Sequence, residues 1–160
     1  MITLLKLLLV AGTIFLYLST LVVAQSGESV PYPEGYRLWT HVKSGIVGPD
    51  RPAHGLHHIY ANPKAMDGFR KGHFENGSVI VFDLLDLDTK TGATVIGDRR
   101  LIDVMHKDDK GFSKTGGWGF EEFRGDSRTQ RDVGENATAK CFTCHAGQKE
   151  RGFVFSSFRE

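Results

Sequence analysis

Cysteine is scarce in this chain of 160 residues, which contains only two cysteines and five prolines. Two cysteines are too few for a disulfide-rich secreted scaffold. A basic excess is also lacking: Lys6 is the only charged residue of the first 24, which leaves 19 basic and 19 acidic residues in the remainder. This balance argues against a nucleic acid as the partner, because phosphate binding needs a surplus of positive charge. The length suits one ordinary domain.

A second long apolar run is missing as well, and the one that exists lies at the N-terminus, from Leu7 to Ala24. Residues Val22-Val23-Ala24 before Gln25 fit a secretory signal peptide that is cut after Ala24. The alternative is an uncleaved anchor, because a run of about 18 residues lies at the lower limit for a membrane span. We therefore expect a signal peptide or anchor at 1–24, a linker at 25–31 and an exported, periplasmic domain at 32–160, which contacts the membrane only if the leader stays attached.

Turn and capping residues divide the exported part into short elements. Asn62-Pro63 predicts a helix that ends near Lys71-Gly72. Asn76-Gly77 predicts a tight turn into a strand over Ser78–Leu87, whose partner strand is expected at Arg99–His106 after a second turn at Lys90–Gly92. The remaining expectations are a short strand or helix start at Tyr36–Val42, a loop over Ser44–Gly55, a strand at His57–Ala61, a strand through Phe123, a surface loop over Arg124–Glu135, a helical segment at Ala137–Ala146 and a final strand at Gly152–Phe158. Together they predict an α+β domain, mostly antiparallel β-sheet with a few short helices.

Both cysteines fall in Cys141-Phe142-Thr143-Cys144-His145, the C-x-x-C-H signature of c-type haem attachment. On a helical turn these spacings place two thiols and an imidazole on one face, so Cys141 and Cys144 reach the haem vinyl groups while His145 points at the iron. The alternatives are a disulfide, a thioredoxin-like redox pair and half of a zinc site completed by His57 or His58. Export agrees with the haem interpretation, which predicts one covalently attached haem c.

The motif ends only 15 residues before the last residue, Glu160. Small electron-carrying cytochromes c usually carry it near the mature N-terminus, together with a distant Met ligand. Four-helix cytochromes c′ do place it near the C-terminus, but they need long helical repeats that this strand-rich sequence lacks. Neither architecture fits.

Several segments together resemble the cytochrome P460 family over about Tyr32 to Glu160. They are Tyr32-Pro33-Glu34-Gly35-Tyr36 with Trp39, Tyr60-Ala61-Asn62-Pro63, Phe74 through Asp83, Gly117-Trp118-Gly119-Phe120, and the haem motif followed by Val154-Phe155. The resemblance implies a largely β-sheet c-haem fold shared with the cytochromes c′-β, often dimeric, with His145 as the proximal ligand and an open or weakly occupied distal side. Its best-known members oxidise hydroxylamine, and the c′-β members bind NO or CO.

One position departs from the hydroxylamine-oxidising members, which join a lysine to the haem edge. Counted five residues on from Gly77, that position is Phe82, which has no nucleophilic amine. Strand alternation allows Phe82 to face the haem as an apolar distal residue, with a plain core role as the alternative. Lys43, Lys64, Lys71 and Lys107 have no matching position for such a cross-link.

Three functions remain open. The first is binding or slow conversion of small nitrogen oxides at an open haem, as a sensor, scavenger or haem oxidoreductase. The second is a six-coordinate electron carrier, with His57 or His58 as the least improbable sixth ligand and Met66 and Met105 as weaker ones. The third is hydroxylamine oxidation. The expected partners are a diatomic or nitrogen-oxide ligand, a redox partner protein and a second copy of the chain.

Overall fold

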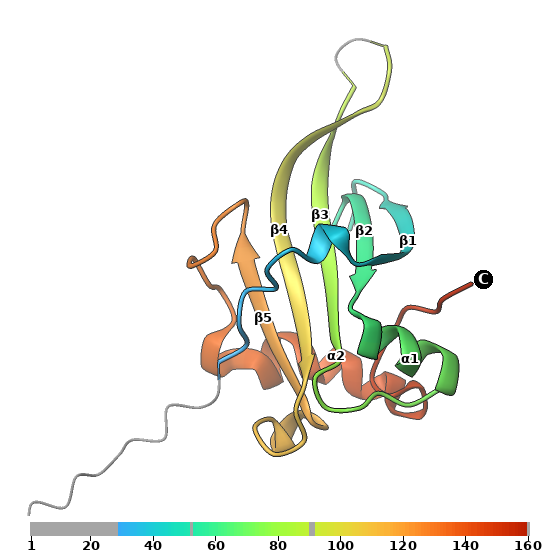
Figure 1. The fold of residues 1–160 in the computed structure, drawn as a ribbon. Coiled ribbons are helices and arrows are strands. Elements are labelled where there is room, and N and C mark those ends of the chain that lie inside the picture. The colour runs from blue at the N-terminus through green and yellow to red at the C-terminus, as the bar shows by residue number, and fades with distance from the viewer. Residues whose placement is uncertain (1–28, 52, 90–91, 160) are drawn as a thin grey trace, which may run out of the picture.

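The computed structural model describes residues 29–51, 53–89 and 92–159. Five strands form one antiparallel sheet in the order β1-β2-β3-β4-β5, so each strand pairs with its neighbour in the sequence (Figure 1). The elements are η1 (Tyr36–Leu38), β1 (Thr40–Val47), β2 (Gly55–Ala61), α1 (Pro63–Lys71), β3 (Val79–Asp88), β4 (Val95–Lys107), η2 (Ser113–Thr115), β5 (Trp118–Arg124), η3 (Gly134–Asn136), η4 (Thr138–Phe142), α2 (Thr143–His145) and η5 (Ala146–Arg151). The predicted α+β class with a mostly antiparallel sheet is confirmed.

The predicted leader lies outside the described residues, as does most of the expected turn at Lys90–Gly92. Within the part of the chain that the structure describes, no helix has the length and apolarity needed to cross a membrane.

Helix α1 begins and ends where its capping residues predict. Asn62 has an extended backbone, and its Oδ1 accepts a hydrogen bond from the backbone N–H of Ala65 at 2.9 Å. Pro63 occupies the first helical position, where no N–H is needed. Gly72 ends the helix in the left-handed conformation at φ +78°. The same Asn62 Oδ1 also accepts from the N–H of Val79 at 3.0 Å, so this one side chain connects α1 to the start of β3.

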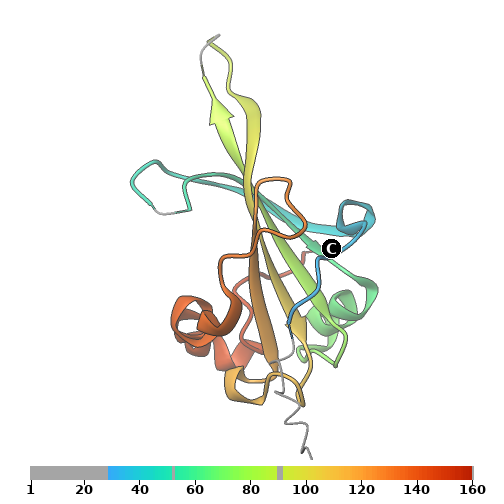
Figure 2. The ribbon, with the colours of Figure 1, turned by 90° about the vertical axis from the view of Figure 1, so that its left-hand side faces the viewer.

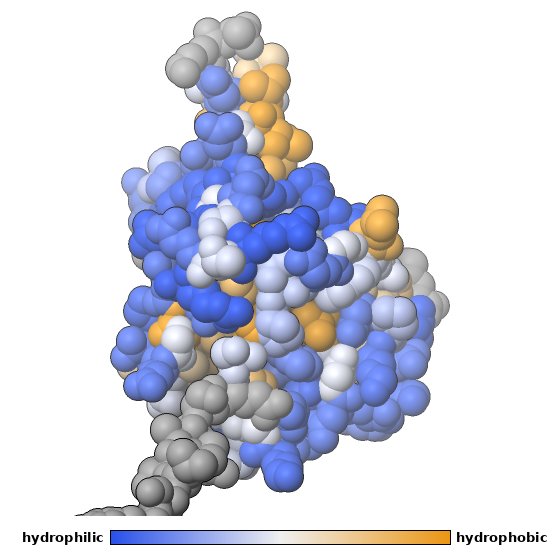
Figure 3. All heavy atoms as spheres, turned by 60° about the vertical axis from the view of Figure 1, so that its left-hand side comes forward, coloured by the Kyte–Doolittle hydropathy of each residue, from blue (hydrophilic) through white to orange (hydrophobic). Residues whose placement is uncertain are grey.

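Strands β3 and β4 are the longest in the sheet and extend beyond it as a hairpin arm (Figure 2). Their outer ends pair Asp88 with Val95, and the arm exposes Val95 and Ile96, which are 49% and 57% accessible to solvent. Figure 3 shows apolar atoms gathered on this arm above a mostly polar surface.

Apolar side chains pack on both faces of the sheet, as alternation along the strands requires. One face carries a core around Ile80, Met105 and Phe120, which α1 and the C-terminal segment help to cover. The other carries a core around Val81, Val104 and Phe123, which is covered by the N-terminal segment with Tyr36. Figure 2 shows the helical segment that contains α2 and the N-terminal segment on opposite sides of the sheet.

Two sequence predictions differ from the structure. The loop expected from Ser44 is wrong in its first part, because β1 continues to Val47 and pairs with β2 as far as Gly55. The strand expected over Gly152–Phe158 is wrong: this segment has no strand partner and begins with a left-handed turn at Gly152 and Phe153. Its apolar residues instead pack against the first core through side chains such as Val154.

Candidate functional site

A cavity of about 420 Å³ lies against the face of the sheet that carries the Ile80 core. Cys141, Cys144 and His145 all line it, so the structure brings the three motif residues to one site. The volume falls in the range of about 300–1,000 Å³ that is typical of cofactor and ligand sites. Its other lining residues come from all five strands and the C-terminal segment: Lys43, His57, Ile59, Ile80, Phe82, Asp103, Val104, Met105, Phe120, Glu121, Lys140, Val154, Phe155 and Ser156.

The motif lies in a nearly continuous helical segment, as predicted for Ala137–Ala146. A π-helical turn, η4, leads into α2, and η5 continues to Arg151. Cys141 is half-buried and Cys144 is exposed, and the two thiols are not bonded to each other. The first thiol therefore points into the cavity wall while the second stands at its rim.

His145 is held in one tautomer by a backbone carbonyl. Its Nδ1 lies 2.7 Å from the carbonyl oxygen of Phe153. Because a carbonyl only accepts, Nδ1 carries the proton and Nε2 keeps a free lone pair. Burial lowers the pKa of His145, opposed by the bond to Phe153. The ring centroids of Phe120 and Phe155 each lie 4.9 Å from the imidazole centroid. A neutral, oriented imidazole with a free Nε2 is the form that binds a metal.

One row of directly opposed side chains crosses this face of the sheet, one from each strand, and the first four of them line the cavity. The row runs Lys43, Ile59, Phe82, Asp103 and Glu122 in strand order. Phe82 thus faces the cavity at the centre of the row, on the face predicted by alternation. The wall near it is more polar than the apolar pocket expected from the sequence, because a lysine and a carboxyl group share its row.

A second ring rests on Phe82. The imidazole of His57 stacks on it with centroids 4.8 Å apart and an interplanar angle of 20°. Gly45 makes room for this arrangement, since a Cβ there would lie 2.6 Å from Cε1 of His57. Burial lowers the pKa of His57, and the nearby positive charge of Lys43 lowers it further. The stacked imidazole is therefore neutral at physiological pH.

Asp103 is the acidic side chain beside Phe82. Burial raises the pKa of its carboxyl group to about 7, and the negative charge of the opposed Glu122 adds to the shift. No hydrogen-bond or ion-pair partner of its carboxyl group occurs among the described residues. The cavity therefore contains a group that gains or loses a proton near neutral pH.

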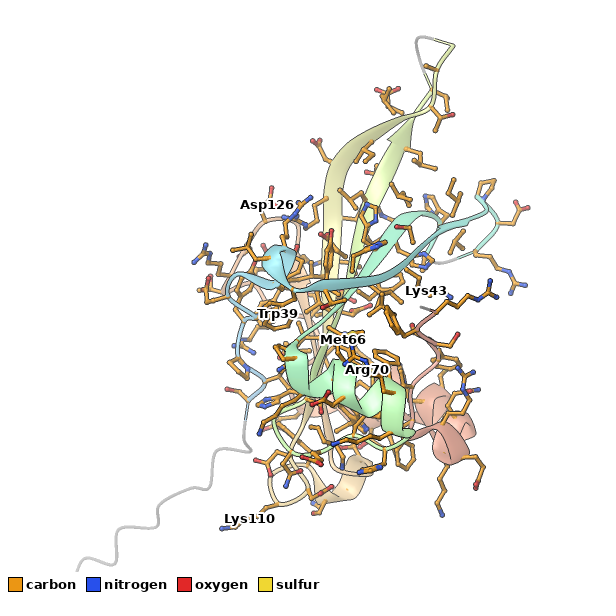
Figure 4. The ribbon with its side chains drawn as sticks, turned by 45° about the vertical axis from the view of Figure 1, so that its right-hand side comes forward. Trp39, Lys43, Met66, Arg70, Lys110 and Asp126 are labelled. Atoms are coloured by element: carbon orange, nitrogen blue, oxygen red, sulfur yellow. The ribbon has the colours of Figure 1, made fainter. Side chains whose placement is uncertain are left out.

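The residues present fit a haem. Cys141 and Cys144 offer two thiols at one end of the cavity, His145 offers the ligand nitrogen, and Ile59, Ile80 and Met105 offer apolar walls. Vinyl and propionate groups lie at opposite edges of a porphyrin, and Lys43 lies on β1 beside the last residues of the chain, where it suits a carboxylate (Figure 4).

The alternative of a zinc site lacks ligands. Among the residues in the described ranges, no three His, Cys, Asp or Glu side chains lie close enough to hold a metal ion. Burial also raises the pKa of Cys141 to about 12, whereas zinc binds the thiolate.

Only some of the other predicted ligands line the cavity. His57 lines the cavity, whereas His58 lies on the opposite face, where its Nδ1 is 2.7 Å from the hydroxyl oxygen of Ser44. Met105 lines the cavity, whereas Met66 is buried on α1 in the core (Figure 4). Of the lysines considered for a cross-link, Lys43 lines the cavity, and Lys64, Lys71 and Lys107 do not.

Three groups in or near the site were not predicted from the sequence: the carboxyl group of Asp103, the carbonyl of Phe153 and the indole of Trp118. Period-two alternation from Phe82 through its cross-strand partner identifies Asp103 only once the register of β3 and β4 is known. Every residue has a backbone carbonyl, so the sequence does not indicate which carbonyl binds His145. Trp118 stands in Gly117-Trp118-Gly119-Phe120, one of the segments that carry the family resemblance, and this gives it no role of its own.

Residues 33–156 match the family model described as Cytochrome P460. The matched range includes every strand of the sheet and the complete Cys141–His145 motif. No curated protein matches the chain.

Proposed function

Because the chain belongs to the cytochrome P460 family and is therefore a c-type haem protein, we propose that Cys141 and Cys144 attach one haem c covalently and that His145 binds its iron. The observation that carries this assignment is the convergence of all three side chains on one cavity, with Nδ1 of His145 held by Phe153 and Nε2 left free. Thioether attachment needs two thiols at a fixed spacing, and axial ligation needs a neutral imidazole.

The proposed activity is binding or slow conversion of small nitrogen oxides, NO above all, in the periplasm. When bound, the haem supplies an iron with a coordination position for a diatomic ligand. Phe82, Ile59 and Met105 line the cavity and limit the space beside the haem. Asp103 holds a proton near neutral pH beside Phe82, which suits a conversion that takes up or releases protons.

Electron exchange with a partner protein is part of this proposal. The exposed Cys144 places the attached edge of the cofactor at the surface. An exposed edge allows a redox protein to approach without a change in the fold.

Optical spectra of the protein matured with a c-type assembly system test the proposal. In the ferrous state we expect a high-spin spectrum that shifts when CO is added, followed by rapid NO binding. A low-spin ferrous spectrum that does not respond to CO would contradict the open site.

The second candidate is a six-coordinate electron carrier, and the observation in its favour is His57. This imidazole lines the cavity and is neutral at physiological pH, as an iron ligand must be. The CO experiment separates the two, and His57→Phe supplies the control: a carrier ligated by His57 would gain CO binding in this variant. Hydroxylamine oxidation is third, because Phe82 has no amine to join the haem edge. A strongly red-shifted ferrous band would instead indicate a cross-linked haem, with Lys43 as the cavity lysine to test first.

A further inference from the structure

Trp118 is a fixed hydrogen-bond donor behind the candidate ligand. Its side chain is fully buried at the start of β5. Its Nε1 donates to the carbonyl oxygen of Gly152 at 2.9 Å. The ring of Phe74 packs against the indole edge-on at 5.5 Å between centroids, and Lys107 lies over the indole face at 5.9 Å. The indole N–H is thus held in one direction by packing on several sides.

The carbonyl that it holds belongs to a strained turn. Gly152 has φ +64°, and Phe153, with φ +66°, is the only non-glycine residue with a positive φ within the described ranges. This conformation is unfavourable for a residue with a Cβ, which comes too close to the following carbonyl oxygen. Such strain persists only where surrounding contacts impose it.

Packing around the ring of Phe153 supplies those contacts. The ring fills the space above Gly116, where a Cβ would lie 2.6 Å from ring carbon Cε2. It also contacts the ring of Phe142, one residue after Cys141, at 5.5 Å between centroids. The backbone N–H of Phe153 donates to the carbonyl of Gln148 at 2.8 Å.

The turn directs two successive carbonyls to two different donors. The carbonyl of Gly152 accepts from Trp118, and the carbonyl of Phe153 accepts from Nδ1 of His145 at 2.7 Å. An extended strand, as the sequence predicts here, would point these two carbonyls to opposite sides and pair them with another strand. The left-handed turn instead places the second carbonyl on the candidate iron ligand.

We propose that Trp118 and the Gly152–Phe153 turn are positioning residues that set the strength of the hydrogen bond to His145, and through it the electron donation from His145 to the iron. The inference rests on the proposed function, in which His145 is the axial ligand. A stronger bond from Nδ1–H makes the imidazole a more basic ligand, which strengthens the iron–histidine bond and lowers the reduction potential. Trp118 is not itself a lining residue of the cavity, so its hydrogen bond acts on the ligand through this turn.

Resonance Raman spectroscopy of the ferrous protein tests this, because the iron–histidine stretching band reports the strength of that bond. Trp118→Phe removes the indole N–H and keeps an aromatic ring. Phe153→Gly keeps both carbonyls but removes the ring and the conformational restriction that hold the turn. We expect both variants to shift the band to lower frequency and to raise the reduction potential. The matched control is Trp39→Phe, which alters the other tryptophan, on the opposite face of the sheet, and should leave both readings unchanged.

The outcomes separate this inference from the proposed function. If the wild-type ferrous protein shows no iron–histidine band, His145 is not the ligand of an open iron and both proposals fail. If the band is present but keeps its frequency in Trp118→Phe and Phe153→Gly, with circular dichroism unchanged, only the positioning role is overturned. Should Trp118→Phe fail to fold, Phe153→Gly decides alone, because glycine adopts a positive φ without strain.

Discussion

At the scale of single residues, Asp103 is the cavity side chain whose pKa is shifted into the neutral range. It faces the cavity directly opposite Phe82 on β3, with Glu122 opposite it on β5. Like charges directly opposed across two strands are unfavourable. Burial, and to a smaller extent this repulsion, favour the protonated form of Asp103, whose pKa rises from the ordinary value of 3.8 to about 7.

This shift predicts how stability depends on pH. The folded state binds a proton more tightly than the unfolded state, so the contribution of Asp103 is complete below about pH 4 and is lost as the pH rises through about 7. We expect the free energy of unfolding, measured with urea at pH 5 and pH 8, to fall less with pH in Asp103→Asn than in the wild type. Asp98→Asn, at an exposed position on β4, is the control, and its free energy of unfolding should change with pH as that of the wild type does.

His145 gives a second prediction at this scale. His145→Ala removes the proposed axial nitrogen but leaves Cys141 and Cys144 available for attachment. We expect haem to remain covalently bound, as seen in a denaturing gel stained for haem, while the optical spectrum loses its proximal-histidine character. An unchanged axial spectrum would show that another residue is the ligand.

At the scale of elements, the junction of α1 and β3 depends on one side chain. Asn62 accepts two hydrogen bonds through Oδ1 and donates one through Nδ2 to the carbonyl of Gly77 at 2.9 Å. An N-cap alone contributes about 0.5–2 kcal/mol. Because Asn62→Ala also leaves the backbone groups of Val79 and Gly77 without their partner, we expect a loss of about 1–3 kcal/mol in urea unfolding. The exposed Asn136→Ala should change stability by less than about 0.5 kcal/mol.

Elements with strong local signals could be predicted from the sequence, and those fixed by tertiary contacts could not. The Asn62-Pro63 start and Gly72 end of α1 are local, and so is the β-branched run of β3. The end of the chain looks like a strand from its spaced phenylalanines, but it packs on one face of the sheet and does not pair with a strand. There the packing of Phe153 against Gly116 and the donor Trp118 decide the conformation.

The residues of the candidate site likewise fall into those that local patterns predict and those that depend on tertiary structure. Cys141, Cys144, His145 and the cavity-facing side of Phe82 follow from spacing and alternation. Which of His57 and His58 faces the cavity depends on the register of β2, and one residue of slip would exchange them.

At the scale of the whole molecule, the hairpin arm of β3 and β4 is the largest feature outside the compact part (Figure 2). Its exposed Val95 and Ile96 stand among charged neighbours such as Asp98. Two adjacent exposed apolar side chains on a protruding arm suit an association surface. We propose that a second copy of the chain covers it, as expected for a homodimer.

Sedimentation velocity tests the dimer. We expect a dimer for the wild type and a monomer for the double variant Val95→Lys, Ile96→Lys, because two charges at the contact would have to be buried. Leu38→Lys is the control: Leu38 is 92% exposed on η1, away from the arm, and the variant should remain dimeric. A monomeric wild type would contradict the proposal.

The order of the strands in the sheet has a consequence for how the protein is made. Each strand pairs with the one synthesised just before it, and the cysteines follow only after the fifth strand is complete. A sheet in which each strand pairs with its neighbour in the sequence forms quickly, because each pairing closes only a short loop. If the chain is exported, as proposed, the sheet can assemble before the thiols leave the translocation machinery. The attachment enzymes would then meet a preformed sheet whose C-terminal segment is not yet packed. Cells deprived of haem should accumulate a folded, protease-resistant sheet of which only the C-terminal segment is cut.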